Sequence, residues 1–256
     1  MTSALAGRVV LVTRPEALAA RLASLLRAEG GEAVLFPAIE ILPPEQPAKL
    51  AELIGRLGAF DIAIFISPTA VAKADAAVRA SRAWPLPLRC AAVGGGTAQA
   101  LCAAGFTDII APQGRGDSEA LAALPELAVV RGKRIVIFRG QGGRETLREI
   151  LEARGAEVAY AECYRRALPR AEVAPLIDRW QRGGVHAVSI TSTEGLKNLL
   201  ALLGPAGAPL LCATPVFVPH PRVGKAARAL GIERVIVTGT SDEALVEAIA
   251  AFFAKV

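Results

Sequence analysis

The stretch "IFRGQGGRETL", residues 137–147, places glycines and two arginines at the end of a short apolar run. A turn of this kind before a helix holds anions through backbone N–H groups and positive side chains. Neither common phosphate fingerprint fits, because the glycine spacing is not that of a dinucleotide loop and no Gly-Lys-Ser/Thr follows. Either arginine can also pair with a nearby acid, Glu145 or Glu149. The candidate anion contacts are Arg139, Gly140, Gly142, Gly143 and Arg144.

Other turns rich in hydroxyl residues and glycine also follow apolar runs. Each has an ordinary structural explanation, because Ser and Thr cap helices and Gly relieves a tight turn. Ligands of open α/β sheets nevertheless bind at this edge, where helix N-termini offer unpaired N–H groups. A surface lined with such turns and with few acids suits a small polyanion. The further candidates are Arg14, Ser67, Pro68, Thr69, Gly94, Thr97, Thr191, Ser192 and Thr193.

Common catalytic sets are missing from the sequence. It shows no Ser/His/Asp arrangement, paired carboxylates or metal-ligand cluster, so no residues are evident that could perform hydrolytic or metal-dependent chemistry. The four cysteines have no CxxC spacing and the two histidines are far apart, which predicts four ordinary buried thiols and no metal site. Tyr164 and Tyr160 are the only tyrosines. Two interpretations of Tyr164 are equally consistent with the sequence: an aromatic side chain that serves packing, and a hydroxyl with a functional role.

Composition restricts the class of protein and its partners. With 256 residues, 53% apolar and 21% charged, the chain suits one large or two small globular domains. The net charge of +5 is dispersed and aromatic residues make up 5%, which argues against nucleic acid. No apolar run approaches the ~18 to 20 residues of a membrane span, and no signal-like segment precedes the first strand. We therefore expect a cytoplasmic protein without a membrane partner.

Apolar β-rich runs alternate with helical periodicity along the chain. Short continuous runs separated by helices are typical of buried parallel strands in an α/β fold. Ten strands are too many for one compact sheet of this length, so we expect two sheets. The predicted strands are residues 9–13, 33–36, 62–66, 89–93, 108–111, 134–138, 157–161, 187–191, 215–218 and 234–238.

An internal repeat also predicts two similar units. A shift of 125 residues places Arg14 on Arg139 and Ser67 on Ser192, and the same offset recurs in separate segments. Taken alone, the repeat favours a tandem division near residue 125. Two extended, proline-ended segments, "PAIEILPPEQP" (37–47) and "AECYRRALPR" (161–170), read instead as connectors that pair as a two-stranded ladder.

Together the motifs resemble the uroporphyrinogen-III synthase family. Each motif is short, but the set is specific because it follows the family's order and spacing over essentially the whole chain. The motifs are "VLVTRP" (10–15), "IFISPTAV" (64–71), "AAVGGGTAQAL" (91–101), "SEAL" (118–121), "RGQGGRETLREILEARGAEV" (139–158), "CYRRALP" (163–169), "ITSTEGL" (190–196) and "SDEAL" (241–245).

The resemblance implies an α/β fold of two similar lobes, each with a mostly parallel sheet flanked by helices, joined by a two-stranded connector. Residues 1–37 and 170–256 would form one discontinuous domain, residues 48–160 the second, and residues 38–47 with 161–169 the linker. It further implies a monomer without metal or organic cofactor.

The implied reaction is the cyclisation of hydroxymethylbilane to uroporphyrinogen III, with loss of water and inversion of ring D through a spiro intermediate. The substrate carries eight carboxylates, which suits the donor-rich turns. Tyr164 matches the family's connector tyrosine and is the candidate proton donor, since a phenol is protonated at neutral pH. The resemblance adds His220 and Arg222 as binding residues, although "PHPRVG" departs from the family's pattern there.

The sequence leaves other classes of function open. One is a non-catalytic two-lobed protein that binds or senses a small polyanion with the same fold. Another is a nucleotide-dependent transferase, which the failed phosphate fingerprints disfavour.

Overall fold

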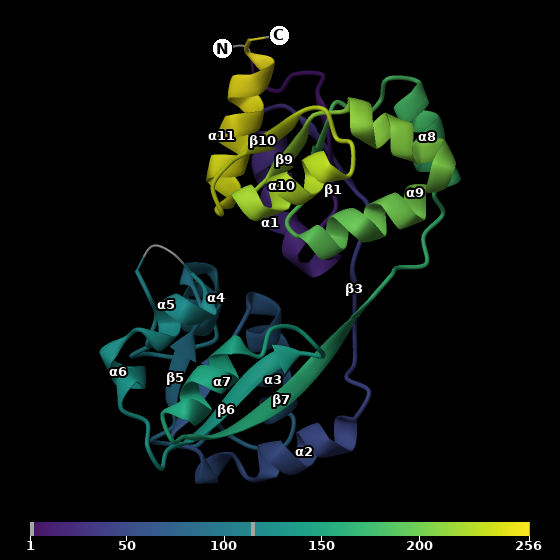
Figure 1. The fold of residues 1–256 in the computed structure, drawn as a ribbon. Helices are drawn as coiled ribbons and strands as arrows, with labels where there is room; N and C mark the ends of the chain where they lie inside the picture. Colours follow the sequence, from purple (N-terminus) through teal and green to yellow (C-terminus); the bar gives the residue numbers. More distant parts are fainter. Residues whose placement is uncertain (1–2, 114–115, 256) are drawn as a thin grey trace. The chain divides into compact units, whose positions relative to one another are not determined.

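The computed structural model describes residues 3–113 and 116–255. Its chain divides into two compact units (Figure 1). The first unit contains the chain up to Glu40 and from Ala167 onward, and the second contains Ile41–Arg166. The first is therefore discontinuous in sequence, and the chain passes between the units twice.

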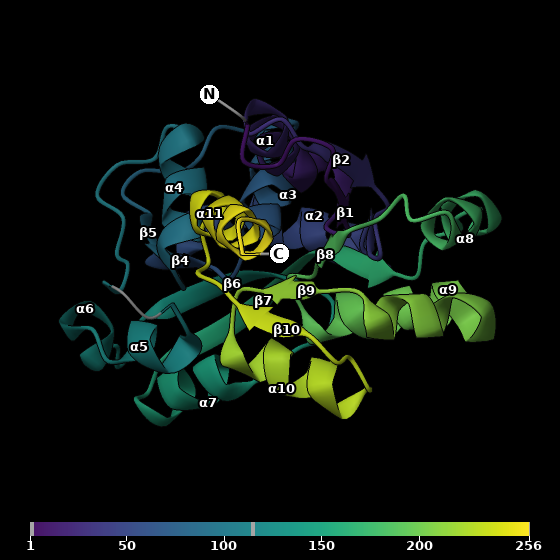
Figure 2. The same cartoon turned by 90° about the horizontal axis from the view of Figure 1, so that it is seen from above.

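The first unit has a five-stranded sheet in the order β10-β9-β8-β1-β2. The strands pair in parallel and are β1 (Val9–Val12), β2 (Glu32–Leu35), β8 (Ala187–Ser189), β9 (Val216–Val218) and β10 (Val235–Val237). One core packs α1 (Glu16–Ala28) and α11 (Asp242–Phe253) on one face. The other core packs α8 (Ala174–Gln181), α9 (Thr193–Ala213) and α10 (Pro221–Ala229) on the opposite face (Figure 2). Side chains of β1 alternate between these cores, as a pleated strand requires.

The second unit repeats this architecture with the sheet order β3-β7-β6-β4-β5. Its strands are β3 (Glu40–Leu42), β4 (Ile62–Phe65), β5 (Arg89–Ala92), β6 (Arg134–Gly140) and β7 (Glu157–Ala167). One face carries α2 (Pro47–Gly55), the short η1 (Leu57–Ala59), α3 (Pro68–Arg79) and α4 (Gly95–Ala103). The other face carries α5 (Ser118–Ala122), α6 (Pro125–Ala128) and α7 (Thr146–Ala153). The α/β class with two mainly parallel sheets is confirmed.

The topology reproduces the internal repeat. A shift of 125 residues carries β1 onto β6, β2 onto β7, β4 onto β8 and β5 onto β9. The matched strands stand in the same spatial order in the two sheets. The repeat therefore relates two copies of one parallel sheet, although the division observed near residues 40 and 167 is not the tandem one that it favours alone.

Two strand predictions need correction. Residues 108–111 form no strand and contribute one isolated bridge, from Ile110 to Ala91. Conversely, β3 lies in a stretch interpreted as a connector and adds to the edge of the second sheet beside β7. The strand β7 also continues without a break through the segment interpreted as the second connector. The two connector segments thus pair as part of a sheet rather than as a separate ladder.

Helix α9 corrects the expectation that no segment has the length and composition of a membrane span. It has 21 residues with a mean hydropathy of 1.4 in its most apolar window. It is, however, two helices joined by a kink at Gly204, whose φ of 58° and ψ of −165° are not helical. Pro205 follows directly, where a proline suits the start of a helix. Neither half approaches the ~20 residues that span a bilayer.

The prediction of four buried thiols holds only for Cys90 and Cys163. Burial raises the pKa of each of these two thiols to about 12, which makes them inert. Cys102 is exposed and Cys212 is half-buried. Within the described residues, no three His, Cys, Asp or Glu side chains gather as a metal site would require.

Candidate functional site

The predicted turns lead into helices at one edge of each sheet. The strands that precede them run parallel, so their carboxyl ends share an edge. Three serines there cap a helix by accepting the N–H three residues on, at 3.1 Å for Ser67, 3.0 Å for Ser192 and 3.2 Å for Ser241. These caps are structural, and contact of Ser67 or Ser192 with a ligand stays a prediction.

Tyr164 reaches its position through a β-bulge. Arg139 pairs with Glu162, but the next residue, Gly140, pairs with Tyr164. This shift in the register between β6 and β7 leaves Cys163 without a partner in the ladder. Regular alternation would place Tyr164 on the same face as Tyr160. Because of the bulge, Tyr164 packs in the core beneath α2–α4, whereas Tyr160 packs against the core beneath α5–α7.

The hydroxyl of Tyr164 belongs to a chain of hydrogen bonds. Its Oη lies 3.2 Å from Ser67 Oγ, and Arg166 Nη1 donates to it at 3.3 Å. The same guanidinium lies 5.8 Å from the centre of the Tyr164 ring. Tyr164 is only 2% exposed, whereas Ser67 is half-buried. The chain thus leads from a buried phenol to a serine that a ligand can reach.

The direction of these bonds follows from the available donors and acceptors. Ser67 Oγ accepts from the N–H of Ala70 and has one further acceptor position and one proton. Tyr164 Oη accepts from Arg166, so its own proton can go to Ser67. The proton of Ser67 is then free to point at a ligand.

Two close approaches explain the glycines of the turn 140–143. A Cβ on Gly140 would lie 2.5 Å from Cε2 of Tyr164, and one on Gly143 would lie 2.8 Å from Nη2 of Arg139. Gly142 and Gly143 also have φ values of 71° and 110°, which side chains disfavour. Packing against Tyr164 and Arg139 thus requires glycine at positions 140 and 143, and the backbone conformation favours it at position 142.

Arg139 is buried and its guanidinium closes this turn. Nε donates to the Gly140 carbonyl at 3.2 Å, Nη2 donates to the Gly142 carbonyl, and Nη1 pairs with Glu145 at 3.0 Å. The guanidinium also lies 4.3 Å from the ring centre of Tyr160. Pairing with Glu145, one of the two roles that the sequence left open, is present. Contact of Arg139 with a ligand stays a prediction.

Tyr160 and Glu145 perturb each other's titration. Burial and the hydrogen bond to Glu145 raise the pKa of Tyr160 to about 12. The hydrogen bond from Tyr160, followed by the one from Arg139, lowers the pKa of Glu145. At neutral pH Tyr160 is therefore a fixed hydrogen-bond donor and Glu145 a fixed anion.

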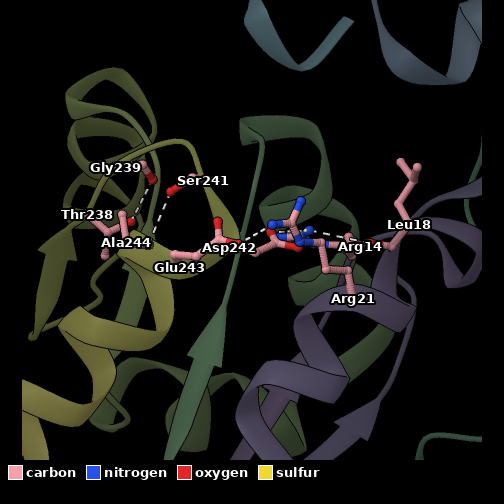
Figure 3. Close-up of polar contacts among 9 residues, drawn as sticks. All are labelled: Arg14, Leu18, Arg21, Thr238, Gly239, Ser241, Asp242, Glu243 and Ala244. Atoms are coloured by element: carbon pink, nitrogen blue, oxygen red, sulfur yellow. Dashed lines mark hydrogen bonds and ion pairs between the residues drawn. The ribbon is translucent and has the colours of Figure 1, made fainter. Parts of the chain in front are cut away.

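The other two candidate arginines in turns are also paired with acids. Arg144 pairs with Glu119 at the start of α5. In the first unit Arg14 Nη1 lies 2.7 Å from Asp242 Oδ1 at the start of α11, beside the pair of Arg21 with Glu243 (Figure 3). The positive charge that these turns can offer an anion is therefore smaller than the sequence suggests.

The remaining predicted residues lie at helix starts. Thr97 is buried in the first turn of α4, and Gly94 precedes it in close backbone contact with Gly116, whose Cα would be 3.0 Å from an added Cβ. Pro68 and Thr69 begin α3, Thr193 begins α9 after the exposed Thr191, and His220 and Arg222 lie exposed at the start of α10.

Sequence reasoning missed Arg166, Glu145 and Tyr160 as parts of this site. Arg166 could have been found, because residues two apart on a strand share a face and Tyr164 was already a candidate. Glu145 was considered only as a partner for an arginine. Its contact with Tyr160 depends on how a turn and a neighbouring strand meet, which no local pattern encodes.

The fold and site define a class: a two-unit α/β protein with a repeated parallel sheet and donor-rich turns at the sheet edges. The family model described as uroporphyrinogen-III synthase HemD matches residues 20–247. The uroporphyrinogen-III synthase of Escherichia coli (strain K12) is 38% identical over 243 residues, covering 94% of this chain and 99% of the relative. That of Salmonella typhimurium (strain LT2) is 39% identical over the same shares. The chain belongs to the uroporphyrinogen-III synthase family, whose curated members are named as enzymes.

Solved structures agree on the fold. A mutant uroporphyrinogen III synthase from the extremely thermophilic bacterium Thermus thermophilus matches with a TM-score of 0.62 at 17% identity, covering 97% of this chain and 100% of that one. The Helicobacter pylori 26695 protein matches with a TM-score of 0.58 at 14% identity, covering 96% and 99%. At such identities the likeness speaks for the fold alone. The family match disfavours the non-catalytic alternative.

Proposed function

We propose that this protein cyclises hydroxymethylbilane to uroporphyrinogen III, with loss of water and inversion of ring D, in tetrapyrrole biosynthesis. The observation that carries the proposal is the family match over residues 20–247, with a relative named uroporphyrinogen-III synthase 38% identical over 94% of the chain. The reaction is a cyclising elimination that needs no redox change. We propose that it proceeds without metal or organic cofactor, as in the family.

The turns at the sheet edges would bind the substrate's carboxylates. Helix N-termini and arginines suit carboxylates because both offer N–H donors with positive charge. The three arginines in these turns that pair with acids would act mainly by holding their turns in shape. Backbone N–H groups and the hydroxyls would then carry much of the binding.

The proposed chemistry begins at the chain from Tyr164 to Ser67. Ser67 gives its proton to the substrate's terminal hydroxyl as the C–O bond breaks, and it takes the proton of Tyr164 in return. Water and a reactive azafulvenium cation result, because the pyrrole keeps its N–H proton, and Arg166 stabilises the tyrosinate through its bond to Oη. General acid assistance of this kind contributes about 10² to 10⁴ in rate.

Ring closure requires orientation more than further chemistry. The substituted carbon of ring D attacks the azafulvenium cation and forms the spiro intermediate, which fragments and closes at the other position. The proton lost when the ring regains aromaticity returns through Ser67 to Tyr164, so the protein ends as it began. Well-aligned reactants gain about 7 to 11 kcal/mol in favourable cases. Unassisted closure gives the symmetrical type I isomer instead.

The proposal includes a cytoplasmic monomer with no nucleic-acid or membrane partner. Dispersed charge and the scarcity of aromatic residues support the absence of a nucleic-acid partner. Light scattering coupled to size exclusion would test the oligomeric state, with a mass near 26.6 kDa expected.

Isomer analysis tests the reaction itself. The purified protein is coupled to a source of hydroxymethylbilane, the products are oxidised to porphyrins, and the isomers are resolved. Type III should dominate, and addition of a metal chelator should not change the rate. Formation of type I alone would contradict the proposal.

A further inference from the structure

A cluster of three polar side chains lies across the second sheet from Tyr164. Arg139 and Tyr160 stand on neighbouring strands, and Glu145 stands at the start of α7. Glu145 accepts from Arg139, and the guanidinium of Arg139 lies over the Tyr160 ring. Arg139 therefore contacts both of the others. None of the three has a hydrogen bond to the Tyr164 hydroxyl, whose bonds go to Ser67 and Arg166.

The cluster acts on the turn 140–143 through Arg139. Its guanidinium donates to two carbonyls of the turn, those of Gly140 and Gly142. Gly143 lies so close to the guanidinium that an added Cβ would be 2.8 Å from Nη2. A buried guanidinium is costly unless its charge is balanced, and Glu145 supplies that balance. The Tyr160 ring beneath the guanidinium adds a cation–π contact. The turn is thus held from inside by a single neutralised cation.

The same turn supports Tyr164. Gly140 lies directly against the ring, where even a Cβ would not fit, and the N–H of Gln141 donates to the Tyr164 carbonyl at 2.8 Å. Movement of the turn would therefore move both the ring and the backbone of Tyr164. The Tyr164 hydroxyl has its partner in Ser67 only while the ring stays in place.

We infer that Arg139, Glu145 and Tyr160 are positioning residues that fix this turn and so hold Tyr164 in line with Ser67. The inference rests on the proposed function of Tyr164 as proton donor. The cluster touches neither reacting atoms nor substrate in this role. Its effect falls on kcat and on the ratio of type III to type I product, because a misplaced donor slows the enzyme while unassisted closure continues.

Glu145→Ala is the primary test, with Glu149→Ala as its matched control. Glu149 is exposed on the same helix and loses the same charge, while its backbone N–H, which donates to the Glu145 carbonyl, is kept in the alanine variant. We expect Glu145→Ala to lower kcat about ten- to a hundredfold, since small misplacements cost that much, and to raise KM only as far as the displaced turn binds substrate. Glu145→Gln keeps an acceptor for Arg139 but not the balancing charge, so its kcat should lie between that of Glu145→Ala and that of the unaltered protein. Glu149→Ala should match the unaltered protein.

Tyrosine NMR gives a readout that does not need turnover. The chain has only two tyrosines, so ring-labelled tyrosine gives two sets of signals, which Tyr160→Phe assigns. Glu145→Ala should shift and broaden the Tyr164 signals, although Glu145 contacts only the other tyrosine. Unchanged Tyr164 signals would overturn the inference whatever kcat does, and so would an unchanged kcat in Glu145→Ala. An unaltered protein that forms only type I would instead overturn the proposed function, while the NMR result still decides the positioning.

Discussion

The hydroxyl oxygen of Tyr164 lies 3.2 Å from the Oγ of Ser67, a residue that at the same time caps helix α3. One serine thereby joins the start of a helix to the only tyrosine hydroxyl on that face of the sheet among the described residues. The geometry gives a buried proton a route to a half-buried atom. Because the route consists of two separate side chains, a single substitution can remove one hydroxyl and leave the other in place.

Tyr164→Phe removes the proposed donor and keeps the ring that packs against Gly140. We expect kcat to fall about 10²- to 10⁴-fold, the range that a general acid contributes. KM and the thermal midpoint should change little, because the ring fills the same space. Steady-state kinetics with isomer analysis checks this, and an unchanged kcat would remove Tyr164 from the mechanism.

Ser67→Ala separates proton relay from helix capping. Loss of a serine cap costs about 0.5 to 2 kcal/mol of stability, and Ser241→Ala loses a cap of the same geometry without a tyrosine partner. Both variants should therefore be destabilised to a similar extent in urea. Only Ser67→Ala should lose kcat, by about tenfold or more. Equal kcat values in the two variants would show that Ser67 is a cap and nothing else.

Gly140→Ala tests the contact that seats Tyr164. The new Cβ would lie 2.5 Å from Cε2 and 2.6 Å from Cζ of the ring, so the ring or the turn must move. We expect a fall in kcat of about a hundredfold from the misplaced donor. Gly55→Ala, at the end of α2 with nothing within 4 Å of its Cβ, is the control and should keep full activity. Comparable kinetics for both variants would mean that the close approach has no functional weight.

Most of the fold could be predicted because its signals are local. Continuous apolar runs such as "VVLV" and "IAIF" become buried parallel strands, and the constant repeat offset gives two sheets of the same order. Strand β3 was missed because three residues between prolines carry too little pattern, and its pairing depends on β7. Residues 108–111 have the composition of a strand, yet the neighbouring chain offers them a single bridge.

The site was predictable in outline only. The turns and Tyr164 could be found because turn chemistry is local and the motif is recognisable. The face on which Tyr164 lies could not, since one unpaired residue, Cys163, reverses the alternation and depends on the register of β6. The pairing of each arginine with its acid likewise depends on tertiary contacts, which local sequence patterns do not encode.

His186 predicts how stability depends on pH in the first unit. Its Nδ1 accepts the N–H of Val9 at 3.0 Å, and burial together with the charge of Arg8 lowers the pKa of its imidazole below the ordinary 6.5. As pH falls below 6.5 the unfolded chain takes up a proton that the folded protein resists, so the stability present above that pH is lost. Urea midpoints between pH 7.5 and 5 should decline, and His186→Asn, which keeps an acceptor without titrating, should flatten the curve. An equal decline in the variant would assign the effect to other groups.

Asp242→Asn tests whether the Arg14 pair is structural. The side chains of Arg14 and Asp242 are only 15% and 13% exposed, and Nε of Arg14 is buried without a partner. Removing the carboxylate leaves a largely buried charge unbalanced, which should lower the free energy of unfolding by about 1 to 3 kcal/mol. Glu243→Gln is the matched control on the same helix turn, because its pair with Arg21 is 46% and 67% exposed and such pairs contribute little. Urea denaturation of both variants measures the free energy of unfolding. An equal decrease in the two variants would show that the buried Arg14 pair contributes no more to stability than the exposed Arg21 pair.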